Sequence, residues 1–168
     1  FRSLNDHQMP TYPIADIRKL DWHVPAVPEE LLRPGIEISG PASVTGMFIN
    51  ALNPGPDATI AEGDLDDDED ASGHRLIDTV TAALNRLAAV KGDLNYYDSK
   101  RQKRYELYGG ELPFFMHRER GLHLDETGVT IDENPIPASI LGTGLTIFHA
   151  GRVQIEKGQG LYFYLPKM

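Results

Sequence analysis

Residues 114–126 read FFMHRERGLHLDE, an apolar run followed directly by arginines, histidines and acidic residues. The apolar residues 113–116 predict a short buried strand, which places Arg118 at its C-terminal edge. In parallel α/β proteins this edge of the sheet is where ligands bind. The stretch therefore predicts both a strand of such a sheet and the start of a candidate site.

Composition narrows the class of partner. A formal net charge of -9 argues against a nucleic-acid or membrane-surface binder and favours small molecules or proteins. The absence of cysteine excludes disulfides and thiolate metal sites and favours an intracellular, cytoplasmic location. No apolar stretch has the length of a membrane span. The chain begins at Phe1 without a methionine and stops at Met168 directly after a strand-like run, so we expect a piece of a longer protein.

Outward from this stretch, strand and helix patterns alternate. Strands are predicted at 36–38, 58–61, 113–116 and 161–165, and helices at 44–52, 72–90 and 138–157. The tyrosine-rich segment 94–108 predicts a two-stranded hairpin with a basic tip. The run LYFYL (161–165) is typical of a strand covered on both faces. This alternation implies a parallel sheet with helices outside it, hence a doubly wound fold or a (β/α) barrel.

The helix over 72–90 is the strongest single prediction. Ser72 is its expected cap. Apolar residues recur at helical spacing and should form the buried stripe: Ile77, Val80, Ala83, Leu84, Leu87 and Val90. At the other extreme, residues 1–35 contain five prolines, which suits an extended connecting arm better than a packed helix. We therefore expect an arm over 1–35 and one domain over 36–168, with the hairpin inserted at about 93–110.

Several motifs, taken in order, resemble the malate synthase family in its short A-type form. They are EISGP (37–41) followed by MFINALN (47–53), RERGLHL (118–124), IFH (147–149) and GQGLYFYLPKM (158–168). The resemblance runs from about residue 17 to 168 and is specific because the motifs keep their order. It implies an α/β fold that is the first half of a (β/α)8 TIM barrel with a β-hairpin insertion.

The resemblance also implies an activity. The family's enzymes are acyltransferases that convert the acyl group into alkyl on transfer: they condense acetyl-CoA with glyoxylate and hydrolyse the thioester to malate and CoA in the glyoxylate cycle, using Mg2+. The metal ligands and the aspartate base are expected in the C-terminal half, beyond residue 168, so residues 1–168 alone should be inactive. Two alternatives stay open: another Mg-dependent CoA-thioester lyase or aldolase of the citrate-lyase-like barrels, and a non-catalytic remnant acting as a binding module.

Arg118 is the candidate catalytic and substrate-binding residue, because the resemblance assigns this role to the first arginine of RERG. A guanidinium can stabilise the oxyanion of a thioester enolate and also hold a carboxylate with two hydrogen bonds. The alternative is a surface ion pair with Glu119 or Glu111. Arg120 and His123 are explained equally well by a role in shaping the loop after the strand.

The acidic run DLDDDED (64–70) is the second candidate feature. The family has Asp, an aromatic residue, Glu, Asp and Ser at this point, and its carboxylates face Mg-bound waters. Matching from Asp64 puts Asp66 in place of the glutamate, with a register open to a shift of a residue or two. Asp64, Asp66 and Asp67 are therefore candidates for contacting a metal's waters. The alternative is a solvated acidic loop that caps the next helix. His117 is assigned to the fold, and His117 with His123 lacks a third ligand for a metal site.

Overall fold

The computed structural model describes residues 19–32 and 35–167. The chain divides into two units, Phe1–Pro34 and Gly35–Met168. The described part of the first unit contains one short helix, α2 (Glu29–Leu32). The predicted connecting arm lies largely outside the described residues and stays a prediction. No helix in the described ranges is long and apolar enough to cross a membrane.

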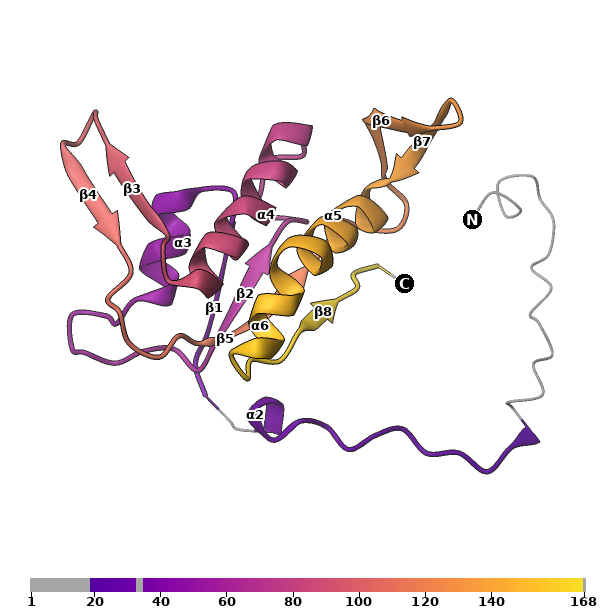
Figure 1. Ribbon diagram of the computed structural model, residues 1–168, viewed down its shortest axis with the longest axis horizontal. Helices are drawn as coiled ribbons and strands as arrows, with labels where there is room; N and C mark the ends of the chain where they lie inside the picture. The colour runs from indigo at the N-terminus through magenta and orange to yellow at the C-terminus, as the bar shows by residue number, and fades with distance from the viewer. Residues whose placement is uncertain (1–18, 33–34, 168) are drawn as a thin grey trace. The chain divides into compact units, whose positions relative to one another are not determined.

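The second unit is built on a parallel sheet whose strands lie in chain order (Figure 1). The order is β1 (Glu37–Gly40), β2 (Gly63–Asp67), β5 (Phe114–Arg118) and β8 (Tyr162–Tyr164). The predicted α/β class with a parallel sheet is therefore confirmed. In a (β/α) barrel, each parallel strand lies beside the next parallel strand of the chain. The order of this sheet has the same arrangement.

Helices connect these strands. They are α3 (Thr45–Leu52), α4 (Leu76–Lys91), and the run formed by α5 (Ala138–Thr146), the π-helical turn η2 (Ile147–Gly151) and α6 (Arg152–Glu156). The helices predicted at 44–52 and 138–157 are confirmed. The second of these contains a π-helical turn that the sequence pattern did not predict.

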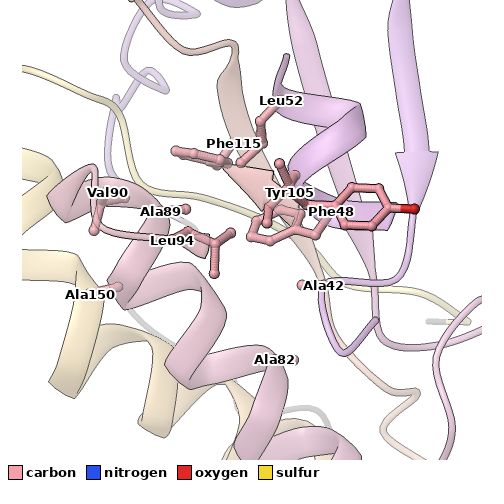
Figure 2. Close-up of a cluster of buried hydrophobic side chains, with 11 residues drawn as sticks. Ala42, Phe48, Leu52, Ala82, Ala89, Val90, Leu94, Tyr105, Phe115 and Ala150 are labelled. Atoms are coloured by element: carbon pink, nitrogen blue, oxygen red, sulfur yellow. The ribbon is translucent and has the colours of Figure 1, made fainter. Parts of the chain in front are cut away.

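A hydrophobic core joins the helices to the sheet (Figure 2). Phe48 of α3 packs against Phe115 of β5 with ring centroids 6.3 Å apart. The buried cluster comprises Ala42, Phe48, Ile49, Leu52, Ala82, Ala89, Val90, Leu94, Tyr105, Phe115 and Ala150. Because these residues come from α3, α4, η2 and the sheet, the core fixes the face of the sheet that the helices cover.

Helix α4 is present, but its predicted buried stripe is partly wrong. Ile77 and Leu84 are 60% and 54% exposed. The buried residues are Thr79, Ala82, Ala83, Asn85, Arg86, Ala89 and Val90. Small side chains let this face approach the sheet closely, and a buried arginine replaces an apolar residue in its centre. The cap is also different: the side chains of Arg75 and Asp78 close the first turn in place of Ser72.

The strand predicted at 58–61 is wrong, because the second strand is β2, formed by the first half of the acidic run. The predicted hairpin is confirmed as β3 (Asn95–Asp98) and β4 (Lys103–Glu106). A further hairpin, β6 (Asp125–Ile131) with β7 (Asn134–Pro137), lies between the strand predicted at 113–116 and the helix predicted at 138–157, where no strand was predicted. The prediction that 161–165 is covered on both faces is wrong for the described chain, since Tyr164 is 48% exposed.

Candidate active site

The register of the sheet decides which acidic residues can meet Arg118. Asp66 pairs with His117 across β2 and β5, and Asp67 pairs with Arg118. Registered partners in parallel strands point to the same face, and successive residues point to opposite faces. Phe115 and His117 face the helices, so Asp64 and Asp66 face them too. Asp67 and Arg118 therefore face the side of the sheet opposite the helices.

On that second side, Arg118 lies at the C-terminal end of β5, as predicted, surrounded by carboxylates. Its Nη1 donates to Asp67 Oδ2 at 3.3 Å, and its Nη2 donates to Glu69 Oε2 at 2.5 Å and to Asp70 Oδ2 at 2.7 Å. The side chain is 20% exposed, so solvent-borne ligands can reach it. The predicted alternative partners, Glu119 and Glu111, are not the residues that hold it.

A turn at the end of β2 brings these carboxylates together. Asp67 Oδ1 accepts hydrogen bonds from the backbone N–H groups of Glu69 and Asp70, at 2.9 and 3.0 Å. This is an aspartate turn, in which a short acidic side chain closes the backbone two residues on. Lys167 adds a second cation, with Nζ 2.5 Å from Glu69 Oε1. The site therefore contains acidic groups from the end of β2 and the turn after it. Its two cations come from β5 and from the segment after β8.

The charges of this cluster support one another. Burial opposes ionisation of Arg118, but Asp67, Glu69 and Asp70 together raise the pKa of its guanidinium. A hydrogen bond to Glu69 likewise raises the pKa of the Lys167 ammonium. Both groups are therefore cations throughout the physiological pH range. The arrangement can stabilise negative charge that develops on a bound ligand, since an anion would share or replace the carboxylates around Arg118.

Asp66 lies on the helix side and is fully buried. Arg86 Nε donates to its Oδ1 at 2.9 Å, and His117 Nδ1 lies 2.5 Å from its Oδ2. Burial alone would favour the neutral acid, but Arg86 and His117 outweigh it and lower the pKa of Asp66. The structure therefore does not bring Asp66 to Arg118, and His117 has the place in the fold that the sequence predicted.

Asp64 also lies on the helix side, beside a cavity of about 290 Å³ whose walls include Ile38, Met47 and Phe48. Both of its carboxylate oxygens are buried without a hydrogen-bond partner among the described residues. Burial, reinforced by the charge of Asp66, raises the pKa of Asp64 to about 8 despite the opposing effect of Arg86. Asp64 is thus largely a neutral acid at neutral pH, away from Arg118.

This raised pKa predicts a pH-dependent stability. Asp64 keeps its proton in the folded protein up to a pKa of about 8, whereas the unfolded chain loses it near 3.8. Between these values unfolding releases a proton, so the free energy of unfolding should fall as pH rises, by about 1.4 kcal/mol per pH unit for this group. Asp64→Asn keeps the shape of the side chain but cannot ionise, so it should remove this group's contribution to the dependence of the unfolding free energy on pH. Urea unfolding of both proteins at several pH values between about 5 and about 8 tests it. Parallel curves for the two would contradict the assignment.

The acidic run as a whole is not the solvated loop of the alternative interpretation. Its members Asp64, Asp66, Asp67, Asp68 and Glu69 are all buried, and Arg75, not a residue of the run, caps the next helix. The local sequence pattern does not single out Glu69, Asp70, Lys167 or Arg86 as site residues. A usable signal was present, because Asp67, Glu69 and Asp70 match the Asp, Glu and Asp of the family order, with Asp68 in place of its aromatic residue.

The remaining residues of the RERGLHL motif shape the loop after β5. Arg120 Nη1 lies 3.0 Å from Glu126 Oε2, and both side chains are buried. A side chain at Gly121 would overlap the ring of His123. These contacts tie the loop to β6. They match the supporting role that the sequence left open for Arg120 and His123.

Among the described residues, no group of three or more histidine, aspartate or glutamate side chains is arranged to hold a metal ion. The acidic groups nearest Arg118 are instead engaged by cations. Carboxylates in such a place can accept hydrogen bonds from the water molecules of a hydrated Mg2+, which keeps several of its waters in proteins.

The comparisons with known proteins agree with one another. Residues 114–168 match the family model described as "Malate synthase, TIM barrel domain". The chain is 38% identical over 152 residues to malate synthase of Myxococcus xanthus, which covers 90% of this chain and 27% of the relative. It is 35% identical over 153 residues to malate synthase A of Escherichia coli, covering 91% and 27%.

A plant relative gives the widest coverage of these three. Glyoxysomal malate synthase of Cucurbita maxima is 33% identical over 172 residues, which is 99% of this chain and 29% of the relative. The chain thus spans less than a third of the length of the relatives it matches. With the parallel sheet, these matches confirm the predicted fold class, part of a TIM barrel.

Proposed function

We propose that this chain, which belongs to the malate synthase family, supplies part of the active site of an enzyme that condenses acetyl-CoA with glyoxylate to give malate and CoA. One observation carries the proposal. Arg118 ends a central parallel strand on the face opposite the helices, as the last residue of β5. Ligands bind at this end of the strands in TIM barrels.

Arg118 has the chemistry that the condensation needs. Loss of a proton from the methyl group of acetyl-CoA produces an enolate, whose oxygen carries the developing negative charge. A guanidinium with two forked N–H groups can donate to that oxygen while also holding the carboxylate of glyoxylate. In the structure Nη1 donates to Asp67 and Nη2 donates to Glu69, so the two nitrogens can donate to two different acceptors at the same time.

The geometry favours a revised match for the acidic run. Asp67, Glu69 and Asp70 match the Asp, Glu and Asp of the family order, three residues later than the match from Asp64, and Asp68 replaces the family's aromatic residue. In this register the glutamate is Glu69, which contacts Arg118. We infer that Asp67 and Glu69 face the waters of a Mg2+ ion when it is bound. The metal would supply electrostatic stabilisation of the glyoxylate oxygens, with its direct ligands expected beyond residue 168.

This register weakens the lyase or aldolase alternative. That alternative rests on the presence of Asp66 in place of the family's glutamate, and in this register Glu69 fills the glutamate position. A non-catalytic binding module accounts less well for an arginine held among three carboxylates at the catalytic end of the sheet. A cytoplasmic location is part of the proposal, although the Cucurbita maxima relative is named glyoxysomal.

The activity is tested with the intact protein that contains residues 1–168. Supplied with acetyl-CoA, glyoxylate and Mg2+, it should form malate and free CoA in equal amounts, measured by chromatography and by a thiol reagent. Omission of glyoxylate is the control and should abolish CoA release above background. Cleavage of a CoA thioester of malate without net condensation would support the lyase alternative. Residues 1–168 alone should form no malate.

A further inference from the structure

The acidic run is held from both faces of the sheet. Asp67 and Glu69 contact Arg118 on one face, and Asp66 and Asp68 contact Arg86 on the other. Asp66 and Asp67 point to opposite faces of β2, and the turn that follows β2 directs Asp68 to Arg86 and Glu69 and Asp70 to Arg118. Two cations, one on each side, thus hold the run of like charges formed by the end of β2 and the turn after it.

Arg86 is built into this position. Its side chain is 1% exposed. Nε donates to Asp66, Nη2 donates to Asp66 and to Asp68 Oδ2 at 2.8 Å, and Nη1 donates to the Thr146 hydroxyl at 3.1 Å. The planar fork therefore links β2, the residue after it and α5. We call Arg86, Asp66, Asp68, Glu119 and Thr146 the Arg86 cluster.

Glu119 completes the Arg86 cluster from the strand that bears Arg118. It follows Arg118 directly and is buried, with Oε1 lacking a hydrogen-bond partner among the described residues. A side chain at Gly142 would overlap its carboxylate, so α5 approaches closely only because that position is glycine. Burial raises the pKa of Glu119 to about 8, with Asp68 and Asp66 adding to the effect and Arg86 opposing it. Glu119 can therefore join the cluster as a neutral acid.

We propose that Arg86 is a positioning residue for the candidate active site, which holds Asp66 and Asp68 toward the helices so that Asp67 and Glu69 face Arg118. This role rests on the function proposed above. Asp66 lies at the end of β2, where a slip of one residue would exchange the faces, and Asp68 begins the turn that contains Glu69. Fixing both side chains therefore restricts where Asp67 and Glu69 can point. The backbone N–H of Asp68 donates to the Arg118 carbonyl at 2.9 Å, which couples the held segment to β5.

The test must separate positioning from the cost of unpaired buried charge. Arg86→Met alone leaves Asp66 and Asp68 uncompensated, which is strongly destabilising. The informative protein is the triple variant Arg86→Met, Asp66→Asn and Asp68→Asn, which removes the cation and both of its acids together. It should fold while lacking the link between the strand end and the helices. Arg86→Lys is the second variant, since a point charge cannot bridge both acids and Thr146.

The first measurement is independent of activity. Hydrogen exchange of the intact protein should show the amides of residues 68–70 exchanging at least about tenfold faster in the triple variant, with the amides of α4 unchanged. Arg86→Lys should show the same change at smaller size. The matched control is Arg152→Met with Glu156→Gln, which removes an exposed ion pair of the same kind. Wild-type exchange at 68–70 in both Arg86 variants would overturn the proposal, whatever the activity.

The second measurement uses the proposed reaction. The triple variant should need about tenfold more Mg2+ for half-maximal malate formation, the size typical of losing an outer partner of a metal site, whereas the control should not. An unchanged Mg2+ requirement together with an unchanged kcat would contradict positioning. If the wild-type protein forms no malate, the proposed function fails instead, and hydrogen exchange still decides whether Arg86 holds the acidic run.

Discussion

Replacing Arg118 by lysine should lower kcat by about two to three orders of magnitude, the size expected for the loss of one oxyanion-stabilising donor. Lysine keeps the charge but has no planar fork. Arg118 uses Nη1 for Asp67 and Nη2 for Glu69 and Asp70, and a single ammonium cannot reproduce that spread. The measurement is malate formation by the intact protein at saturating acetyl-CoA and glyoxylate.

Arg120→Lys is the matched control for this prediction. Arg120 belongs to the same motif, two residues further on, and contacts Glu126 through one close pair of atoms. Its replacement should affect the stability of the loop more than kcat. Should Arg118→Lys retain wild-type turnover while Arg120→Lys loses it, the catalytic role belongs to the second arginine of the motif, and the proposed site is wrong.

Replacing Glu69 by glutamine should raise the Mg2+ concentration needed for half-maximal activity by about ten- to a hundredfold, as for other partners that orient a metal's ligands. The carboxylate faces Arg118 and Lys167, on the side where the substrate is expected. Asp67→Asn should act in the same direction. The readout is the initial rate as a function of Mg2+ concentration at fixed substrate.

Asp66→Asn separates this register from the one matched at Asp64. Asp66 contacts Arg86 and His117 on the helix side, so its replacement should lower stability. Arg86 still holds Asp68 in this variant, so the Mg2+ requirement of the folded enzyme should change much less than in Glu69→Gln. The reverse pattern, in which Asp66→Asn alters the Mg2+ requirement and Glu69→Gln does not, would restore the register that starts at Asp64. If none of Asp66→Asn, Asp67→Asn and Glu69→Gln changes the Mg2+ requirement, Arg118 is left as the sole functional residue of the described chain.

Much of the molecule follows from local pattern. The apolar spacing of residues 44–52 and 72–90 is sufficient to predict helices, which the structure has as α3 and α4, since an amphipathic segment of that period can bury one face only as a helix. The tyrosine-flanked polar tip predicts the β3–β4 hairpin. Arg118 could be placed at a strand end because an apolar run stops directly before it. The order of the motifs was sufficient to indicate the family and its barrel.

The acidic run is where local pattern fails. Five consecutive acids have the composition of a solvated loop, and yet Asp67 ends a buried strand. The charges that make burial possible come from Arg86, 20 residues beyond Asp66, and from Arg118, 51 residues beyond Asp67. A local pattern of about ten to twenty residues contains the acids without either arginine. The burial of Arg86 on α4 could not be predicted for the same reason, because the acids that pair with it lie at the end of β2.

The sequence by itself therefore determined the helices, the β3–β4 hairpin, three of the four strands of the parallel sheet, the family and the arginine at the end of β5, all of which depend on residues close together in the chain. The tertiary structure alone decided which acids belong to the site. That choice depends on the pairing of β2 with β5, in which Asp67 lies beside Arg118 and Asp66 beside His117. Because side chains alternate across a strand, a shift of one residue would exchange the two sets of carboxylates, and only long-range pairing fixes the register.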